Sequence, residues 1–184
     1  IYLPHLYLQE SETACLIVQK MMEKVEVPSY LTSVVERVKG QLGITLSKRQ
    51  YEGVMNAFSH NLTIITGGPG TGKSTILRAV IETFRILNPD GIICLGAPTG
   101  KASRRMTETT GIENAQTLHS LLNLHGDESV WQKKPVFLNA DLLVVDESSM
   151  MDMFLAHQLF TRVRPHTRIL MVGDADQLES VGPG

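Results

Sequence analysis

The sequence contains few cysteines, few aromatic residues and no excess of charge of one sign. Of 184 residues, 2 are cysteine and 5% are aromatic. Because two cysteines cannot form the dense disulfide framework of a small secreted domain, we expect a reducing, cytoplasmic compartment. Lysine and arginine number 17 and aspartate and glutamate 19, which gives a formal charge of -2. This balance excludes a strongly basic nucleic-acid-binding coat, although it allows a local basic patch.

Long hydrophobic runs are also missing. No apolar run approaches the roughly 18 residues that span a membrane, and the chain does not open with a signal peptide, so we expect no membrane partner. Hydrophobic residues nevertheless make up 42% of the chain. That content is enough for the core of one domain, or of one domain with a short attachment. The chain begins without methionine and ends directly after a motif, and we expect it to be part of a longer protein.

The first forty-odd residues have the spacing of two short amphipathic helices, separated at Pro28. The expected apolar face of the first consists of Ala14, Val18, Met21, Met22 and Val25. The expected apolar face of the second consists of Leu31, Val34, Val35, Val38 and Leu42. Because two such helices cannot build a core alone, residues 1–43 are predicted to form a helical segment that docks on a domain formed by residues 44–184.

From residue 47 onward, the pattern alternates between helices and strands. Ser47 and Gln50 match the two ends of a capping box, which predicts a helix start. Apolar strands are expected over residues 62–66, 92–97, 142–146 and 168–173, and helices over residues 74–87, 101–110 and 150–163. Continuous apolar strands between helices predict an α/β fold, with a parallel sheet covered by helices on both faces. Residues 123–139 fit neither period and are expected to form a surface loop or a small hairpin.

Residues 67–74 read GGPGTGKS, which is the pattern of a phosphate-binding loop. Because the pattern lies between a predicted strand and a predicted helix, its glycines can wrap an anion and direct backbone amides toward it. Lys73 is expected to reach the β- and γ-phosphates of a nucleotide, and Ser74 to bind magnesium. The alternative is an ordinary glycine-rich turn, which would not require the lysine and the serine. The residues expected to bind the nucleotide are Gly68, Pro69, Gly70, Thr71, Gly72, Lys73, Ser74 and Thr75.

Acidic residues end the strand predicted over residues 142–146. Strand ends in open parallel sheets gather ligands at one edge. There, Asp146 is placed to hold magnesium, and Glu147 to activate or orient an attacking water. After the next predicted strand, Gln177 can hydrogen-bond the γ-phosphate or the attacking water. The alternatives are a solvated acidic strand end for the first two residues and a polar turn for Gln177.

The order of these motifs resembles the RecD-like group of superfamily 1 DNA helicases, which comprises the exodeoxyribonuclease V alpha subunit and its stand-alone relatives. The resemblance covers residues 46–184. It rests on Gln50 and on the segments GGPGTGKST at 67–75, APTGKASRRM at 97–106, TLHSLL at 117–122, VVDESSMMD at 144–152 and VGDADQLESVGPG at 172–184. The combination of DESSMMD with GDADQL is specific for this group, whereas the helical start of the chain is less specific.

The resemblance implies the first of two RecA-like domains, with ATP in the cleft between them. It implies an ATP-dependent DNA helicase of 5′-to-3′ polarity in recombination or repair, either alone or with other subunits of a helicase–nuclease complex. The implied roles are adenine binding by Gln50, binding of nucleotide and magnesium by Lys73, Ser74 and Asp146, base catalysis by Glu147, and coupling of the γ-phosphate to DNA by Gln177. Gln50 has a second interpretation as a residue that holds the helix start, and the two roles are compatible.

The start of the helix predicted over residues 101–110 is the expected DNA-binding track. A hydroxyl, an amide and a cation at residues 99–101 suit the phosphates of single-stranded DNA or of duplex ends. The resemblance places the first DNA contact here and a further DNA-side motif at residues 117–119. The residues expected to contact DNA are Thr99, Lys101, Arg104, Thr117 and His119. The alternatives are a solvated helix face for Arg104 and Arg105, and a structural role for His119.

Two other functions compete with a helicase motor. The chain can be a different P-loop NTPase, of the AAA+ or kinase type, although Gln177 and residues 99–101 argue against this. It can also be a non-catalytic docking module, with residues 1–43 binding a partner helix. The resemblance implies that the second RecA-like domain and its arginine finger lie outside this chain, so the isolated chain is expected to be nearly inactive as an ATPase.

Overall fold

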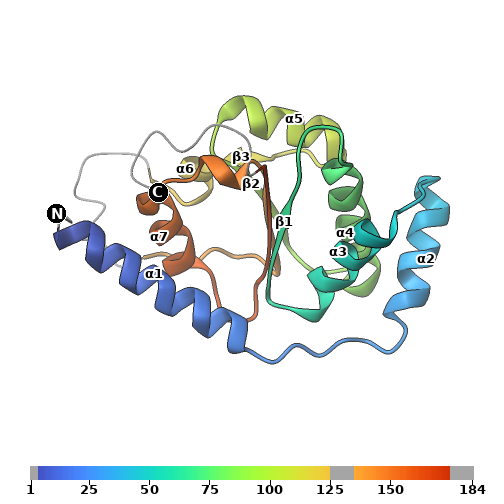
Figure 1. Ribbon diagram of the computed structural model, residues 1–184, viewed down its shortest axis with the longest axis horizontal. Helices are drawn as coiled ribbons and strands as arrows, with labels where there is room; N and C mark the ends of the chain where they lie inside the picture. The colour runs from blue at the N-terminus through green and yellow to red at the C-terminus, as the bar shows by residue number, and fades with distance from the viewer. Residues whose placement is uncertain (1–3, 125–134, 175–184) are drawn as a thin grey trace.

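The computed structural model describes residues 4–124 and 135–174, and a sheet of 5 parallel strands lies at its centre (Figure 1). The order across the sheet is β1-β5-β4-β2-β3. The strands are β1 (Leu62–Thr66), β2 (Ile93–Ala97), β3 (Gln116–Thr117), β4 (Leu142–Val145) and β5 (Arg168–Gly173). Because every neighbouring pair is parallel, the carboxyl ends of the strands meet at one edge of the sheet. The predicted α/β class is confirmed.

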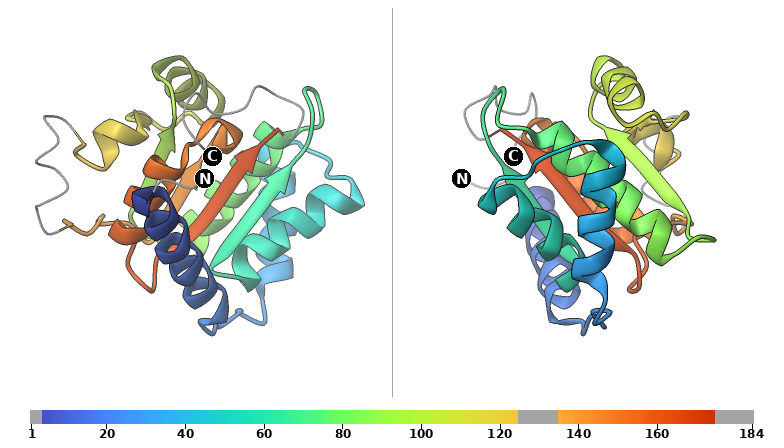
Figure 2. Two further views of the ribbon diagram at one scale, coloured as in Figure 1. Left: turned by 60° about the vertical axis from the view of Figure 1, so that its left-hand side comes forward. Right: turned by 90° about the vertical axis from the view of Figure 1, so that its right-hand side faces the viewer.

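Helices cover both faces of this sheet (Figure 2). One face carries α2 (Leu31–Leu42), α3 (Lys48–Ser59), α4 (Lys73–Leu87) and α5 (Gly100–Thr110). The other face carries α1 (Pro4–Met22), α6 (Leu118–Leu121) and α7 (Met153–Arg162). Within residues 4–124 and 135–174, no helix combines the length and the apolar character that crossing a bilayer requires.

The strand β4 is buried on both faces. Leu142 and Val144 pack into the core on the α2–α5 side, whereas Leu143 and Val145 pack into the core formed with α6 and α7. A parallel sheet with helices on both faces requires a strand that is apolar throughout. The complete burial of β4 therefore explains why its sequence, LLVV, does not alternate.

The second helix buries the face that the sequence predicts. Leu31, Val34, Val35 and Val38 are buried, and Leu42 is half-buried. α2 packs against α4, and Leu31 and Val35 join the same core as the inner residues of α4. The prediction that the N-terminal helices pack on the rest of the chain agrees with this arrangement, while the domain boundary after residue 43 stays a prediction.

The first helix turns a different face to the protein from the predicted one. Ala14 is exposed, and Val18, Met21 and Met22 have exposed fractions of 52%, 66% and 79%. Val25 lies beyond the end of α1 at Met22. The residues that face α7 and its core are Gln9, Thr13, Leu16, Ile17 and Lys20. The predicted burial of the most apolar stripe of this helix is therefore wrong.

A buried lysine fixes the rotation of α1. The Lys20 ammonium group donates hydrogen bonds to the backbone oxygens of Arg164 and Pro165, which follow the end of α7. Burial lowers the pKa of Lys20, and the charge of Glu23 and its hydrogen bond oppose that shift. At the other end of the contact, His157 Nε2 lies 2.8 Å from Glu12 Oε2. Polar contacts of Lys20 and Glu12 thus join the packing of Leu16 and Ile17 in holding the buried face of α1. Hydrophobic periodicity alone is misleading here.

Two other elements differ from prediction. The helix predicted over residues 150–163 begins later, at Met153, as α7. A short 3-10 helix (Ser148–Met150) precedes it. α7 begins there because the Asp152 carboxylate accepts a hydrogen bond from the Leu155 amide at 2.8 Å and caps the helix. β3 and α6 are not predicted, because 2 and 4 residues are too few for a periodic pattern. Of the predicted loop over residues 123–139, residues 125–134 lie outside the described part of the chain.

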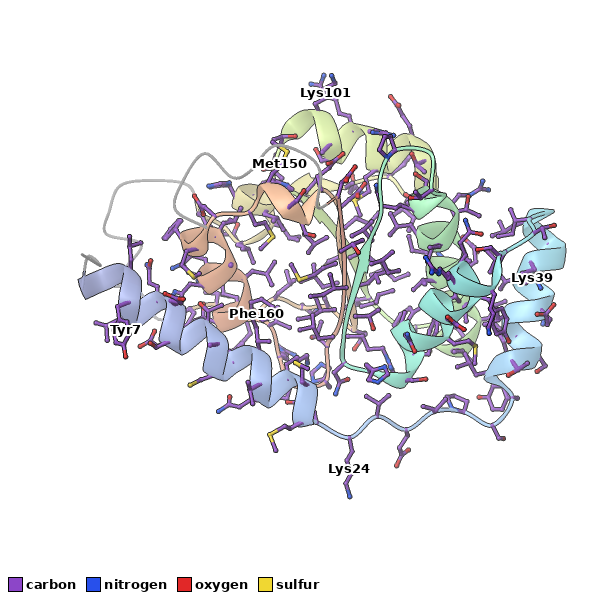
Figure 3. All side chains as sticks on the ribbon, viewed as in Figure 1. Tyr7, Lys24, Lys39, Lys101, Met150 and Phe160 are labelled. Carbon is purple, nitrogen blue, oxygen red and sulfur yellow. The ribbon has the colours of Figure 1, made fainter. Side chains whose placement is uncertain are left out.

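Replacing Lys20 tests how α1 is held. Lys20→Ala removes the donor to two backbone oxygens, and we expect the free energy of unfolding to fall by about 1–3 kcal/mol. Lys24→Ala is the matched control, because Lys24 is exposed and points away from the protein (Figure 3); it should change stability by less than about 0.5 kcal/mol. Urea unfolding followed by circular dichroism measures both. Equal losses in the two variants would contradict the anchoring role of Lys20.

Candidate functional site

The glycine-rich loop connects β1 to α4 at the carboxyl edge of the sheet. Gly70 and Gly72 have φ of 77° and 84°, the left-handed region that favours glycine. Gly72 is also the N-cap of α4. A Cβ atom at Gly72 would overlap the side-chain amide nitrogen of Gln50. The backbone conformation therefore favours glycine at this position, and any side chain here would also displace the end of the Gln50 side chain.

Gln50 connects the start of α3 to this loop. Its Oε1 atom accepts a hydrogen bond from the Ser47 backbone amide at 2.8 Å, and the backbone amide of Gln50 donates to Ser47 Oγ at 3.3 Å. The predicted capping box is thus confirmed. The Gln50 Nε2 atom also donates to the Thr71 backbone oxygen at 3.0 Å. Both polar atoms of the side chain are engaged, and adenine binding by Gln50 stays a prediction.

Lys73, the first residue of α4, folds back over the loop. Its ammonium group donates hydrogen bonds to the backbone oxygens of Gly67 and Gly68. It also lies 3.8 Å from Oδ2 of Asp174, a buried residue at the end of β5. Lys73 is therefore held over the glycine-rich loop, in the cavity that the loop lines.

A cavity of about 260 Å3 brings most of the predicted nucleotide and metal residues together. Its lining residues are Gly68, Pro69, Gly70, Thr71, Gly72, Lys73, Ser74, Arg105, Asp146 and Glu147. Thr75 does not line it; the Thr75 amide donates to the Gly72 oxygen at 3.0 Å within the first turn of α4. Gln177 lies outside the described residues. Gln50 does not line the cavity either. Every lining residue except Arg105 is one that the sequence singles out for nucleotide, metal or catalysis, and these roles stay predictions.

Asp146 and Glu147 follow β4 directly and face the loop across the cavity. Oδ1 of Asp146 accepts a hydrogen bond from the Glu147 amide at 2.9 Å. Burial raises the pKa of Asp146, while that hydrogen bond and the positive charges of Arg105 and Lys73 act in the opposite direction. Glu147 has φ of 54°, an uncommon conformation for a residue other than glycine that is often found at functional sites. The backbone conformation of Glu147 and the hydrogen bond to Asp146 Oδ1 thus place both residues beside the loop.

Ser74 and Asp146 line the same cavity as the loop amides, and this donor set fits magnesium. Mg²⁺ prefers oxygen ligands and is usually bound by one or two protein groups together with phosphate oxygens and water. A hydroxyl and a carboxylate beside a phosphate-sized space meet that requirement.

Arg105 is the residue of the cavity that sequence reasoning misses. Its Nη1 atom lies 3.9 Å from Oε1 of Glu147. The neighbouring residue Arg104, which the sequence favours for DNA, is exposed and does not line the cavity. Adjacent helical residues point about 100° apart, and only the burial of Ala102 and Met106 on α5 reveals which arginine faces the carboxylates.

The predicted DNA-binding residues lie at two neighbouring strand ends. Thr99 is the N-cap of α5, and its Oγ1 atom accepts from the Ala102 amide at 3.2 Å. Thr117 caps α6 in the same way through the Ser120 amide, and Thr117 pairs with Ala97 in the sheet. In both caps the hydroxyl proton remains available to donate. Lys101, Arg104 and His119 are exposed, and Lys101 projects from the top of α5 in Figure 3.

Comparisons with known proteins agree with this geometry. A family model described as an AAA domain matches residues 50–183. The ATP-dependent RecD2 DNA helicase of Deinococcus radiodurans is 38% identical over 184 residues, which are 100% of this chain and 25% of that protein. The RecBCD enzyme subunit RecD of Mycolicibacterium smegmatis is 39% identical over 150 residues, which are 70% of this chain and 27% of that protein. The chain thus spans about a quarter of the length of these relatives.

Solved structures support the same fold. A Pif1 helicase from Candida albicans has a TM-score of 0.55 and 27% identity, and the match covers 75% of this chain and 34% of that one. The UvsW helicase of bacteriophage T4 has a TM-score of 0.54 and 12% identity, over 84% of this chain and 62% of that one, so it supports the fold alone. The expected RecA-like fold is confirmed.

The glycine of the N-cap gives a sharp test of the loop geometry. Gly72→Ala places a side chain in the left-handed region and against Gln50, and we expect it to destabilise the chain by about 1–2 kcal/mol. Gly40→Ala is the control, because Gly40 lies within α2 with no atom near its would-be Cβ; it should stabilise by about 0.5–1 kcal/mol. Urea unfolding of both variants decides the question. A neutral Gly72→Ala would show that the loop adopts another conformation.

Proposed function

Since the chain belongs to the AAA domain family and is homologous to the RecD helicases, we propose that it is the ATP-binding motor domain of an ATP-dependent DNA helicase. The observation that carries the proposal is one cavity lined by the glycine-rich loop, Lys73, Ser74, Asp146 and Glu147. A phosphate cradle, a metal-binding pair and a carboxylate beside them are the parts that phosphoryl transfer to water requires.

In the proposed reaction, ATP places its phosphates against the loop amides. The Lys73 ammonium group then exchanges the backbone oxygens of Gly67 and Gly68 for the β- and γ-phosphates. Glu147 orients the attacking water and accepts its proton, and Gln177 contacts the γ-phosphate. The water oxygen bonds to the γ-phosphorus as the bond from that phosphorus to the bridging oxygen breaks, which releases ADP and inorganic phosphate. Magnesium belongs to the proposal: Ser74 and Asp146 would hold it, and when bound it neutralises negative charge on the phosphates.

Single-stranded DNA is the proposed substrate of the surface beside this cavity. Its phosphates would follow the N-termini of α5 and α6, where Thr99, Lys101, Arg104, Thr117 and His119 lie. This arrangement puts DNA contacts and nucleotide contacts at the same edge of one sheet, because β2, β3 and β4 are parallel neighbours. The paired strands β2, β3 and β4 would thereby connect the two binding sites.

The activity of the whole protein is a wider proposal. We propose unwinding of DNA with 5′-to-3′ polarity, in recombination or repair, by this domain together with a second RecA-like domain. One relative is named as a DNA helicase, and another is named as a subunit of the RecBCD enzyme. Either an independent enzyme or a subunit of such a complex is therefore compatible with the proposal. A reducing, cytoplasmic location is supported by the free thiols of Cys15 and Cys94.

Two variants separate binding from chemistry in the full-length protein. Lys73→Ala should abolish ATP binding measured by calorimetry, because the loop loses its phosphate-binding cation. Glu147→Gln keeps the shape of the side chain and removes the base, so it should retain ATP affinity and lose about 10²–10⁴-fold in turnover. DNA-stimulated ATPase assays measure the second effect. Wild-type turnover in Glu147→Gln would refute the proposed role of the carboxylate.

Charge reversal tests the DNA track. Lys101→Glu should weaken binding of single-stranded DNA, and the slope of log affinity against log salt should fall by about 0.7 for the lost phosphate contact. Lys24→Glu makes the same charge change on the exposed linker after α1, away from the carboxyl edge (Figure 3), and serves as the control. Fluorescence anisotropy over a series of salt concentrations provides both quantities. Equal effects of the two substitutions would count against a track at α5.

A further inference from the structure

Arg105 occupies a place in the nucleotide cavity for which the proposed function has so far supplied no role. α5 buries Ala102, Ser103, Met106 and Thr110 against the rest of the protein, which fixes the rotation of the helix. This rotation directs Arg105, and not Arg104, toward the cavity that contains Lys73, Ser74, Asp146 and Glu147. The packing of α5 therefore places the backbone of Arg105 on the side of the helix that faces the cavity.

The partner of Arg105 is the carboxylate to which water activation is assigned. Arg105 Nη1 lies 3.9 Å from Glu147 Oε1, and among the described residues it is the cation paired with that carboxylate. The backbone of Glu147 is fixed in the left-handed region and begins a 3-10 helix. The remaining freedom of Glu147 is in its side chain, and Arg105 is the group placed to restrict it.

The contact is too exposed to serve stability. The Arg105 side chain has an exposed fraction of 71%, against 20% for Glu147. Exposed ion pairs at this distance contribute little to folding because water screens them. Orientation is a different matter, since misplacing a reacting group by about 1 Å can cost about 10²-fold in rate.

We propose that Arg105 is a positioning residue for ATP hydrolysis, which orients the Glu147 carboxylate toward the water that attacks the γ-phosphate. The inference rests on the ATPase function proposed above. A planar guanidinium group suits this task, because it presents several donors in a fixed geometry to one carboxylate. The distinct alternative is that Arg105 binds the phosphates directly, which would change ATP affinity instead of turnover.

The test uses the full-length protein with saturating single-stranded DNA and four variants. Arg105→Ala should lower kcat about 10- to 100-fold while KM for ATP changes less than about twofold, and Arg105→Lys should recover part of the loss. Arg85→Ala, an exposed arginine in the last turn of α4, controls for loss of an arginine and should match the wild type. Arg104→Ala should instead raise the DNA concentration needed for half-maximal stimulation.

A double-mutant cycle shows whether Arg105 acts through Glu147. In single-turnover experiments, Arg105→Ala should slow hydrolysis in the wild type but hardly further in the Glu147→Gln background. An equal factor in both backgrounds, an effect confined to KM, or wild-type turnover in Arg105→Ala would overturn the proposal. Failure of the proposed function has a different signature, because the wild-type protein would then show no DNA-stimulated ATPase at all.

Discussion

β4 packs Leu142 and Val144 against one layer of helices and Leu143 and Val145 against the other. A slip by one residue would draw Asp141 or Asp146 into the fully buried stretch, so the acidic residues at its two ends fix the register of the strand. The same register places Asp146 immediately past the buried segment, where its amide donates to the Gly96 oxygen at 3.0 Å. On the other side, the Gly67 amide donates to the Gly173 oxygen at 3.3 Å. The packing of the core therefore determines the distance between the two carboxylates and the glycine-rich loop.

Each charged group described in the cavity has a protein partner before any nucleotide binds. Lys73 donates to two loop oxygens and lies near Asp174, Asp146 accepts from a backbone amide, and Glu147 faces Arg105. Unpaired charges in partly buried positions are costly, so the contacts of Lys73 and Asp146 stabilise the site. In the proposed binding of ATP, phosphates would replace the contacts of Lys73 with the loop oxygens, and part of the binding free energy would be used in that exchange.

The strands were predictable because burial on both faces leaves an uninterrupted apolar stretch, as in residues 142–145. The glycine-rich loop and the capping box were predictable because they are local: their atoms belong to residues close in sequence. The face of α1 was not predictable, since periodicity identifies stripes but not which stripe meets a partner. The buried face of α1 combines Leu16 and Ile17 with the buried Lys20. Arg105 was not predictable either, because its contact with Glu147 joins residues 42 positions apart and depends on the packing of α5.

The contact between α1 and α7 has a consequence for the order in which the chain acquires its structure. Glu12 and His157 are separated by 145 residues, and Lys20 and Arg164 by 144. At a synthesis rate of about 5–20 residues per second, roughly 7–30 s pass between the appearance of α1 and that of its partner. α2, α3 and α4 can meet one another much earlier, because they are close in sequence. During synthesis α1 therefore gains its native contacts later than these helices do. Until α7 forms, the face of α1 that packs against it is open to other molecules.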